Sequence, residues 1–257
     1  MRSGAGRKVL GAYVALVYAF VLLPIVVLAL MSFNSATYGT FPLSGLTGDW
    51  YRRLFADAAM LASLRFSIQV ALATVATAVP LGLMAAYGLV RFEFRGKPVF
   101  RAVIVVPLVI PGLLVGIAML TLFHLVGIEP SLITVWLAHT ALALPYTTLI
   151  LAARLQGLDR SFGEAAASLG ATPANAFRRV TLPLLGPGLI GAALLAFTIS
   201  FGEIVVTYFV SGFNQTLPLN IYSQLKTGMT PVVNAVSSII VLVGLACGAV
   251  TTRLSRK

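Results

Sequence analysis

The sequence is poor in charged residues and in the side chains that catalysis commonly uses. Charged residues make up 10% of its 257 residues, and it contains seven acids, two histidines and one cysteine. A single cysteine excludes an intramolecular disulfide, and two histidines far apart offer no zinc spacing and no H-E-x-x-H pair. A G-x-x-x-x-G-K-[ST] phosphate loop is also missing. We therefore expect this chain to be no enzyme and to carry neither a metal site nor a cofactor.

What the sequence has in abundance is apolar residues. They make up 59% of the chain, against about 45–50% in soluble domains, and the mean hydropathy is +0.98. A membrane-spanning helix needs about 20 mostly apolar residues, and six stretches meet this requirement. We predict an all-α membrane protein in which residues 1–257 form a single transmembrane domain. The predicted spans are about 9–32, 65–90, 99–123, 131–152, 187–211 and 232–252.

The net charge of +11 raises the question of a nucleic-acid partner. The lysines and arginines lie in short loops and at the ends of the predicted spans, with no basic stripe among aromatic residues, so we expect no nucleic-acid binding. If the N-terminus is cytoplasmic, all but four of the 18 basic residues fall on the cytoplasmic side. By the positive-inside rule this bias predicts that both termini face the cytoplasm. The four basic residues on the outer side are Arg52, Arg53, Arg65 and Lys226.

The first outer loop, about 33–64, combines aromatic and basic residues. Trp50, Tyr51, Leu54 and Phe55 lie beside two arginines, a pattern typical of a short amphipathic helix at a membrane interface. A plain ordered loop is the alternative.

The segment 156–186, between the fourth and fifth predicted spans, is polar enough to leave the membrane. Ser161 and Glu164 stand three residues apart and match a capping box, which predicts a helix start at Ser161. Gly170 stands where a helix end favours positive φ, so the helix is about two turns long. Thr172 and Pro173 then predict the start of a second helix.

A helix of two turns is marginally stable in water and needs support from other parts of the structure. Its small alanine side chains allow another surface to approach closely, which suits insertion into a cleft of a cytoplasmic partner. A helical hairpin packed on its own membrane domain explains the same residues. The local pattern leaves both alternatives open.

The order E-A-A, three residues, G, nine residues and V-x-L-P, from Glu164 to Pro183, resembles the coupling-loop signature of permease subunits of bacterial ATP-binding-cassette (ABC) importers. The resemblance implies the type I importer permease fold, in which the first helix of this loop contacts a separate ATPase. The residues that it assigns to ATPase coupling are Ser161, Phe162, Glu164, Ala165, Ala166, Ser168, Leu169, Gly170, Ala171, Leu182 and Pro183.

Nearly the whole chain is similar to the second permease subunit of spermidine/putrescine-type importers, notably in Ser32–Ser35, Arg91–Lys97 and Leu217–Ser223. This resemblance implies polyamine transport, or transport of a related small organic solute, across the bacterial inner membrane. It also implies four kinds of partner. These are a homologous permease subunit in a heterodimer, two cytoplasmic ABC ATPase subunits, an external solute-binding protein and the lipid bilayer.

The chain departs from the polyamine-type pattern at two positions where relatives carry an additional acid, Gly202-Glu203 and Pro111-Gly112. These departures put the polyamine assignment in doubt. Of the seven acids only Glu203 falls deep inside a predicted span, where a charge indicates a functional site. Glu203 either lines the solute path or pairs with a neighbouring subunit.

Four further polar residues of the fourth and fifth spans are candidates for the solute path, or else hydrogen-bonded packing residues. They are His139, Tyr146, Ser200 and Tyr208. A secondary transporter or channel that needs no ATPase is the alternative function, because it too requires a polar path through a helical bundle.

Overall fold

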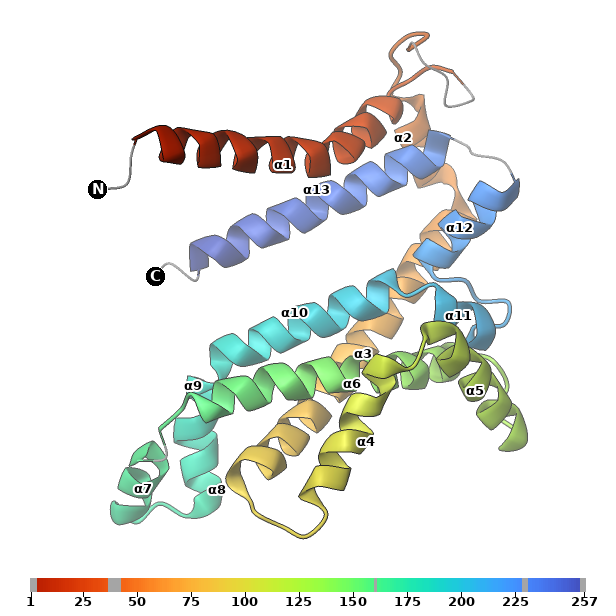
Figure 1. Cartoon of the computed structure of the whole chain (residues 1–257). Coiled ribbons are helices and arrows are strands. Elements are labelled where there is room, and N and C mark those ends of the chain that lie inside the picture. Colours follow the sequence, from red (N-terminus) through yellow and green to blue (C-terminus); the bar gives the residue numbers. More distant parts are fainter. Residues whose placement is uncertain (1–3, 37–42, 160, 228–230, 255–257) are drawn as a thin grey trace. The chain divides into compact units, whose positions relative to one another are not determined.

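The computed structural model describes residues 4–36, 43–159, 161–227 and 231–254 (Figure 1). In these ranges the regular structure is helical, and one isolated bridge joins Asn34 and Leu46. The predicted all-α class is therefore confirmed. The helices before the fifth predicted span are α1 (Gly4–Met31), α2 (Asp49–Ala56), α3 (Ala58–Arg91), α4 (Lys97–Val109), α5 (Gly112–Leu125), α6 (Leu132–Gln156), α7 (Ser161–Ser168), α8 (Pro173–Ala176), the π-helix η1 (Phe177–Thr181) and α9 (Leu182–Leu184). They are followed by α10 (Gly186–Gly202), α11 (Val205–Val210), α12 (Leu217–Thr227) and α13 (Pro231–Leu254).

The chain divides into two compact units, one made of residues 1–61 and 221–257 and the other of residues 62–220. In the first unit, α13 contacts both α1 and α2. In the second unit, α6 is the central helix and contacts α4, α5, α10 and α11.

The helix expected in the first outer loop is present as α2. The buried Trp50 donates a hydrogen bond from Nε1 to the carbonyl oxygen of Asn34 at 2.7 Å, and the hydroxyls of Ser32 and Tyr51 are 2.7 Å apart. Phe55, by contrast, is 64% exposed. Part of the apolar face of α2 therefore packs on the chain itself.

Small residues let the helices of the second unit approach closely. Ala78 of α3, Ala143 of α6 and Ala196 of α10 are fully buried in one cluster. One turn further along α3, a Cβ atom on Gly82 would stand only 2.3 Å from Oγ1 of Thr147. Close helix contacts through small residues are typical of membrane proteins.

We expect the substitution Gly82→Ala to destabilise the chain by about 1–3 kcal/mol, because the added methyl group forces α3 and α6 apart. Thr147 cannot move freely, since its hydroxyl donates to the carbonyl oxygens of Ala78 and Leu144. The measurement is the thermal unfolding midpoint of the purified chain in detergent. Gly88→Ala in the same helix is the matched control, because a Cβ there has no neighbour within 4 Å. Equal midpoints for the two variants would contradict the close contact.

Within the described residues, three helices are long and apolar enough to cross a membrane alone: residues 6–31 of α1, then α3 and α6. Two bent pairs of helices raise the number to five if each pair is one span. For α13, the described apolar part is Pro231–Gly244.

The predicted span 99–123 is broken in the structure, because α4 and α5 meet at an angle of 110°. Pro111 causes the break. Its ring keeps Ile110 extended (φ −80°, ψ 128°), and it has no amide hydrogen to continue the helix. Gly116 of α5 then packs against Phe209 and Val206 of α11.

The predicted span 187–211 is also interrupted. The helix α10 ends at Gly202, Glu203 is extended (φ −74°, ψ 125°), and α11 begins at Val205. Before α10, the stretch Pro173–Leu184 is bent against it by 68°.

Candidate functional site

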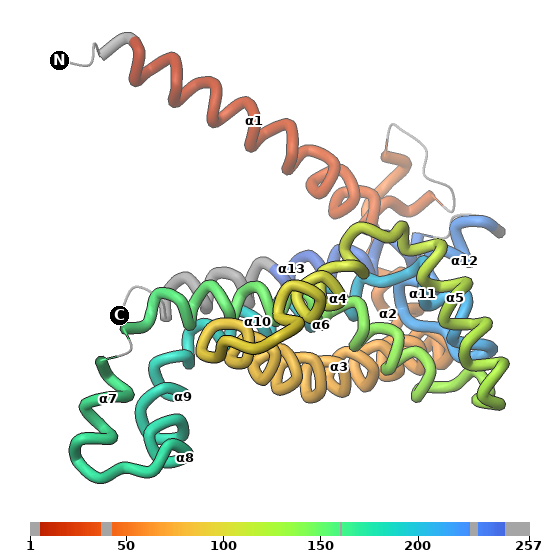
Figure 2. Tube along the Cα trace, turned by 60° about the horizontal axis from the view of Figure 1, so that its bottom comes forward, coloured from red at the N-terminus to blue at the C-terminus, as the bar shows by residue number. Residues whose placement is uncertain are grey.

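In the second unit, the segment 156–186 extends beyond one end of α6 and α10, whereas α5 and α11 lie at the opposite end (Figure 1, Figure 2). It contains α7, α8, η1 and α9, which form a helical hairpin. The predicted two-turn helix is α7, with eight residues.

The N-terminus of α7 is held by Asp159. Its Oδ1 accepts a hydrogen bond from the backbone N–H of Ser161 at 2.9 Å. Bonds from the Ser161 amide and hydroxyl hold the pKa of the Asp159 carboxyl below its usual range. The predicted capping box of Ser161 and Glu164 is therefore wrong, because an aspartate two residues before Ser161 takes its amide.

The C-terminus of α7 ends as predicted. Gly170 has φ +83°, its N–H donates to Ala167 O at 2.9 Å, and the N–H of Ala171 donates to Ala166 O at 3.0 Å. These two bonds form a Schellman motif, which needs a residue with positive φ. Residues inside the loop thus close both ends of α7.

The second helix also begins as predicted. The hydroxyl of Thr172 accepts a hydrogen bond from the N–H of Asn175 at 3.3 Å, with Pro173 in the first turn. The helix then widens into the π-helix η1, where the N–H of Leu182 donates to Phe177 O. Pro183 explains the wider turn. In a regular α-helix its ring would clash with the carbonyl group of the residue four positions earlier.

The two arms of the hairpin differ in what they contact. The ring of Phe177 in η1 lies 5.1 Å from the ring of Tyr87 in α3, so this arm packs on the membrane helices. No side chain of α7 is buried. Phe162 is 51% exposed and Leu169 is 89% exposed, and their spacing of seven residues places them on one face. The outer arm therefore displays an apolar face to its surroundings.

The remaining predicted coupling residues lie on the same hairpin with differing exposure. Exposed residues are Ser161, Glu164, Ala165, Ser168, Gly170 and Pro183, and half-buried residues are Ala166, Ala171 and Leu182. The Glu164 carboxylate makes no hydrogen bond or ion pair within the described residues.

Two of the predicted solute-path residues meet in a buried polar network. Nδ1 of His139 is 2.8 Å from Oγ of Ser200, and Nε2 of His139 is 2.9 Å from Oγ1 of Thr207. Ser200 in turn donates to Thr74 Oγ1 at 3.3 Å. His139 and Ser200 are buried and fully paired, as the packing alternative requires. The network joins α3, α6, α10 and α11.

Glu203 stands at the break between α10 and α11. Its Oε1 accepts a hydrogen bond from the N–H of Val206 at 2.9 Å, and its carbonyl oxygen accepts one from the Thr207 hydroxyl at 2.9 Å. A carboxylate at a helix start is favoured by the exposed amides and the helix dipole. Glu203 therefore has a local structural role that the sequence pattern did not indicate.

Tyr146 and Tyr208 are both exposed, at 40% and 61%, and neither hydroxyl group makes a hydrogen bond within the described residues. The structure therefore does not bring them into the polar network. Among the described residues, no group of three metal-ligating side chains is present.

The threonines of the network were missed by sequence reasoning. Thr74 and Thr207 lie in apolar runs, where a hydroxyl commonly bonds to its own helix. Their partners are separated from them by up to 126 residues, so composition gives no signal. Hydroxyl residues facing one another across predicted spans would have been the only indication.

The fold and the loop define a multi-pass membrane permease. The chain belongs to the family of binding-protein-dependent transport system inner membrane components, whose family model matches residues 78–257. It is therefore a permease subunit of an ABC importer, in which ATP hydrolysis belongs to another subunit. This membership excludes the alternative of an ATPase-independent secondary transporter or channel.

Named relatives agree with the family. The spermidine/putrescine transport system permease protein PotC of Haemophilus influenzae is 36% identical, covering 96% of both chains. The putrescine transport system permease protein PotI of Escherichia coli K12 is 38% identical, covering 87% of this chain and 82% of PotI. A probable molybdenum ABC transporter permease protein of Haloferax volcanii is 35% identical, covering 72% of this chain and 71% of the relative.

The fold also matches a solved structure. A bacterial ABC transporter involved in the import of the acidic polysaccharide alginate has a chain that superposes with a TM-score of 0.76, with 98% of both chains covered and 18% identity.

Proposed function

We propose that α7 is the coupling helix of this permease and inserts into a groove of a cytoplasmic ATPase. The observation that carries the proposal is the exposed apolar face formed by Phe162 of α7 and by Leu169 directly after it, on a helix whose ends are closed by its own loop. A helix of this length needs packing to persist, and the contacts of α7 with α8 and η1 leave none of its side chains buried. An ATPase groove supplies that packing.

The complete importer in this proposal has five protein subunits. A second, homologous permease pairs with this chain as a heterodimer, two ATPase subunits lie on the cytoplasmic side, and a solute-binding protein docks outside. Both termini of this chain face the cytoplasm, and its two units act as one transmembrane permease domain. Closure of the ATPases moves α7, and the packing of Phe177 on Tyr87 transmits the movement to α3.

The proposed cargo is a polyamine. Relatives named for spermidine and putrescine cover nearly the whole chain, and Glu203 supplies a carboxylate for an ammonium group. Only one of its oxygens has a described partner, the Val206 amide. Tyr146 and Tyr208 are the exposed polar residues that we assign to the path, while His139 and Ser200 hold its helices together.

The test is uptake of radiolabelled putrescine by cells that express the complete importer. We expect uptake to fall to background when the ATPase carries a disabling substitution in its phosphate loop, because transport is driven by ATP. Excess unlabelled spermidine should compete, whereas molybdate should not, since Glu203 repels an anion. Uptake that survives loss of the ATPase would refute the proposal that transport is coupled to the ATPase. Competition by molybdate alone would refute the proposal that the cargo is a polyamine.

A further inference from the structure

Three cavities meet around Arg101, near the N-terminal end of α4. The first, of about 540 Å³, lies between the α3–α4 loop and α4. The second, of about 440 Å³, reaches the ends of α3 and α6, and the third, of about 350 Å³, lies between α4 and α6. Arg101 lines all three, so these cavities form one connected surface.

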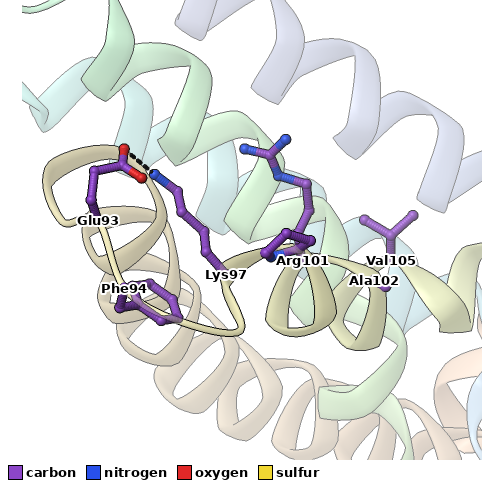
Figure 3. Close-up of a pocket in the computed structure, with 7 residues that line it drawn as sticks. Glu93, Phe94, Lys97, Arg101, Ala102 and Val105 are labelled. Carbon is purple, nitrogen blue, oxygen red and sulfur yellow. Dashed lines mark hydrogen bonds and ion pairs between the residues drawn. The ribbon is translucent and has the colours of Figure 1, made fainter.

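The polar part of this surface has an excess of positive charge. Nζ of Lys97 bonds to Glu93 Oε1 at 2.7 Å, and Nη2 of Arg91 donates to Leu158 O at 3.2 Å. The guanidinium group of Arg101 has no hydrogen bond or ion pair within the described residues. Figure 3 shows the Lys97 and Arg101 side chains extending from the same face of α4. An unpaired guanidinium beside a second cation is suited to bind a phosphate.

The other part of the surface is apolar. The third cavity continues from Arg101 past Ile104 and Val105 of α4 to Leu149, Ala152 and Ala153 of α6. Because α6 is long and apolar enough to span the membrane, this groove runs along the membrane-embedded part of the chain. A ligand that matches both parts needs an anionic head and an apolar chain. A free anion matches only the first part.

We propose that this surface binds an anionic phospholipid, with its phosphate on Arg101 beside Lys97 and an acyl chain in the groove between α4 and α6. The proposal rests on the proposed function in one respect, the orientation, which places this end in the cytoplasmic leaflet where anionic lipids are recognised by basic residues. Gln156 and Asp159 line the second cavity. The lipid therefore supports the residues from which the α7 hairpin emerges.

The test is retention of phosphatidylglycerol by the purified full-length chain, measured by native mass spectrometry against phosphatidylcholine. We expect Arg101→Gln to weaken phosphatidylglycerol binding about fivefold, and Arg101→Glu about 25-fold, since each charge near an anionic head contributes about this factor. Phosphatidylcholine binding stays unchanged. Arg95→Gln is the matched control, because this exposed arginine of the α3–α4 loop lines none of the three cavities.

Two further results distinguish a bound phospholipid from a free anion and from a folding defect. Arg101→Lys should retain most of the phosphatidylglycerol binding, which separates a charge requirement from a folding defect. Soluble glycerol phosphate should fail to displace the lipid at equal concentration, because it cannot fill the apolar groove. Equal lipid retention in Arg101→Gln and Arg95→Gln, or displacement by glycerol phosphate, overturns the proposal. The measurement uses neither ATPase nor cargo, so its outcome is independent of the uptake test.

Discussion

Cells that carry the Gly170→Pro variant are expected to lose ATP-driven uptake, by about 100-fold or more, while the chain still inserts into the membrane. Gly170 has φ +83° and donates its N–H to Ala167 O. Proline fixes φ near −65° and has no amide hydrogen, so it removes both features of the Schellman motif. The end of α7 then unwinds, and the apolar face loses the shape that we propose the ATPase contacts. The measurements are putrescine uptake and copurification of the ATPase.

Gly170→Asn is the control for this variant, because asparagine adopts positive φ more readily than other side chains and keeps the amide hydrogen. It should retain most uptake. A second pair of variants tests the contact without changing the backbone: Glu164→Lys should abolish uptake, whereas Glu129→Lys, also at an exposed acid, should not. Normal uptake with Gly170→Pro, or with Glu164→Lys, would refute the role assigned to α7.

The second large effect is expected from His139→Ala, which should lower the free energy of unfolding by about 3–5 kcal/mol. The substitution removes the hydrogen bonds to Ser200 and Thr207 and leaves a cavity where a fully buried ring stood. Because these bonds tie α6 to both α10 and α11, the break at Glu203 loses its fixed geometry. Denaturant unfolding of the detergent-solubilised chain measures the change.

Two comparisons make the His139 prediction specific. Tyr146→Phe in the same helix should change the free energy of unfolding by less than about 0.5 kcal/mol, because the exposed tyrosine hydroxyl has no described partner. His139→Asn should give an intermediate loss, since its amide can replace one ring nitrogen. A His139→Ala variant as stable as Tyr146→Phe would show that the network does not hold these helices together.

The parts of the structure that sequence reasoning predicted are those fixed by neighbouring residues. The positive φ of Gly170 and the cap of Thr172 depend on residues within the same few positions, and both are present. The capping box failed within this local range, because Asp159 competes for the same amide. Sequence reasoning considered only Glu164 as the acceptor for this amide.

The parts that sequence reasoning missed depend on residues far apart in the sequence or on the angle by which a helix bends. The residues 99–123 were placed in one span, and a proline within a span does not by itself determine a bend of 110°. The partners of His139 lie 61 and 68 residues away. Glu203 was placed inside a continuous span because hydropathy does not show the break before α11, where its side chain accepts a hydrogen bond from the Val206 amide.

The exposed face of α7 has an evolutionary consequence. Since hydrogen bonds within the loop close both ends of the helix and none of its side chains is buried, Phe162 and Leu169 contribute little to the stability of the fold. If α7 docks as we propose, selection at these two positions acts mainly on the match to the ATPase. Substitutions there can accumulate in step with changes in the ATPase groove, and importers with similar membrane folds can become mutually incompatible without any loss of folding.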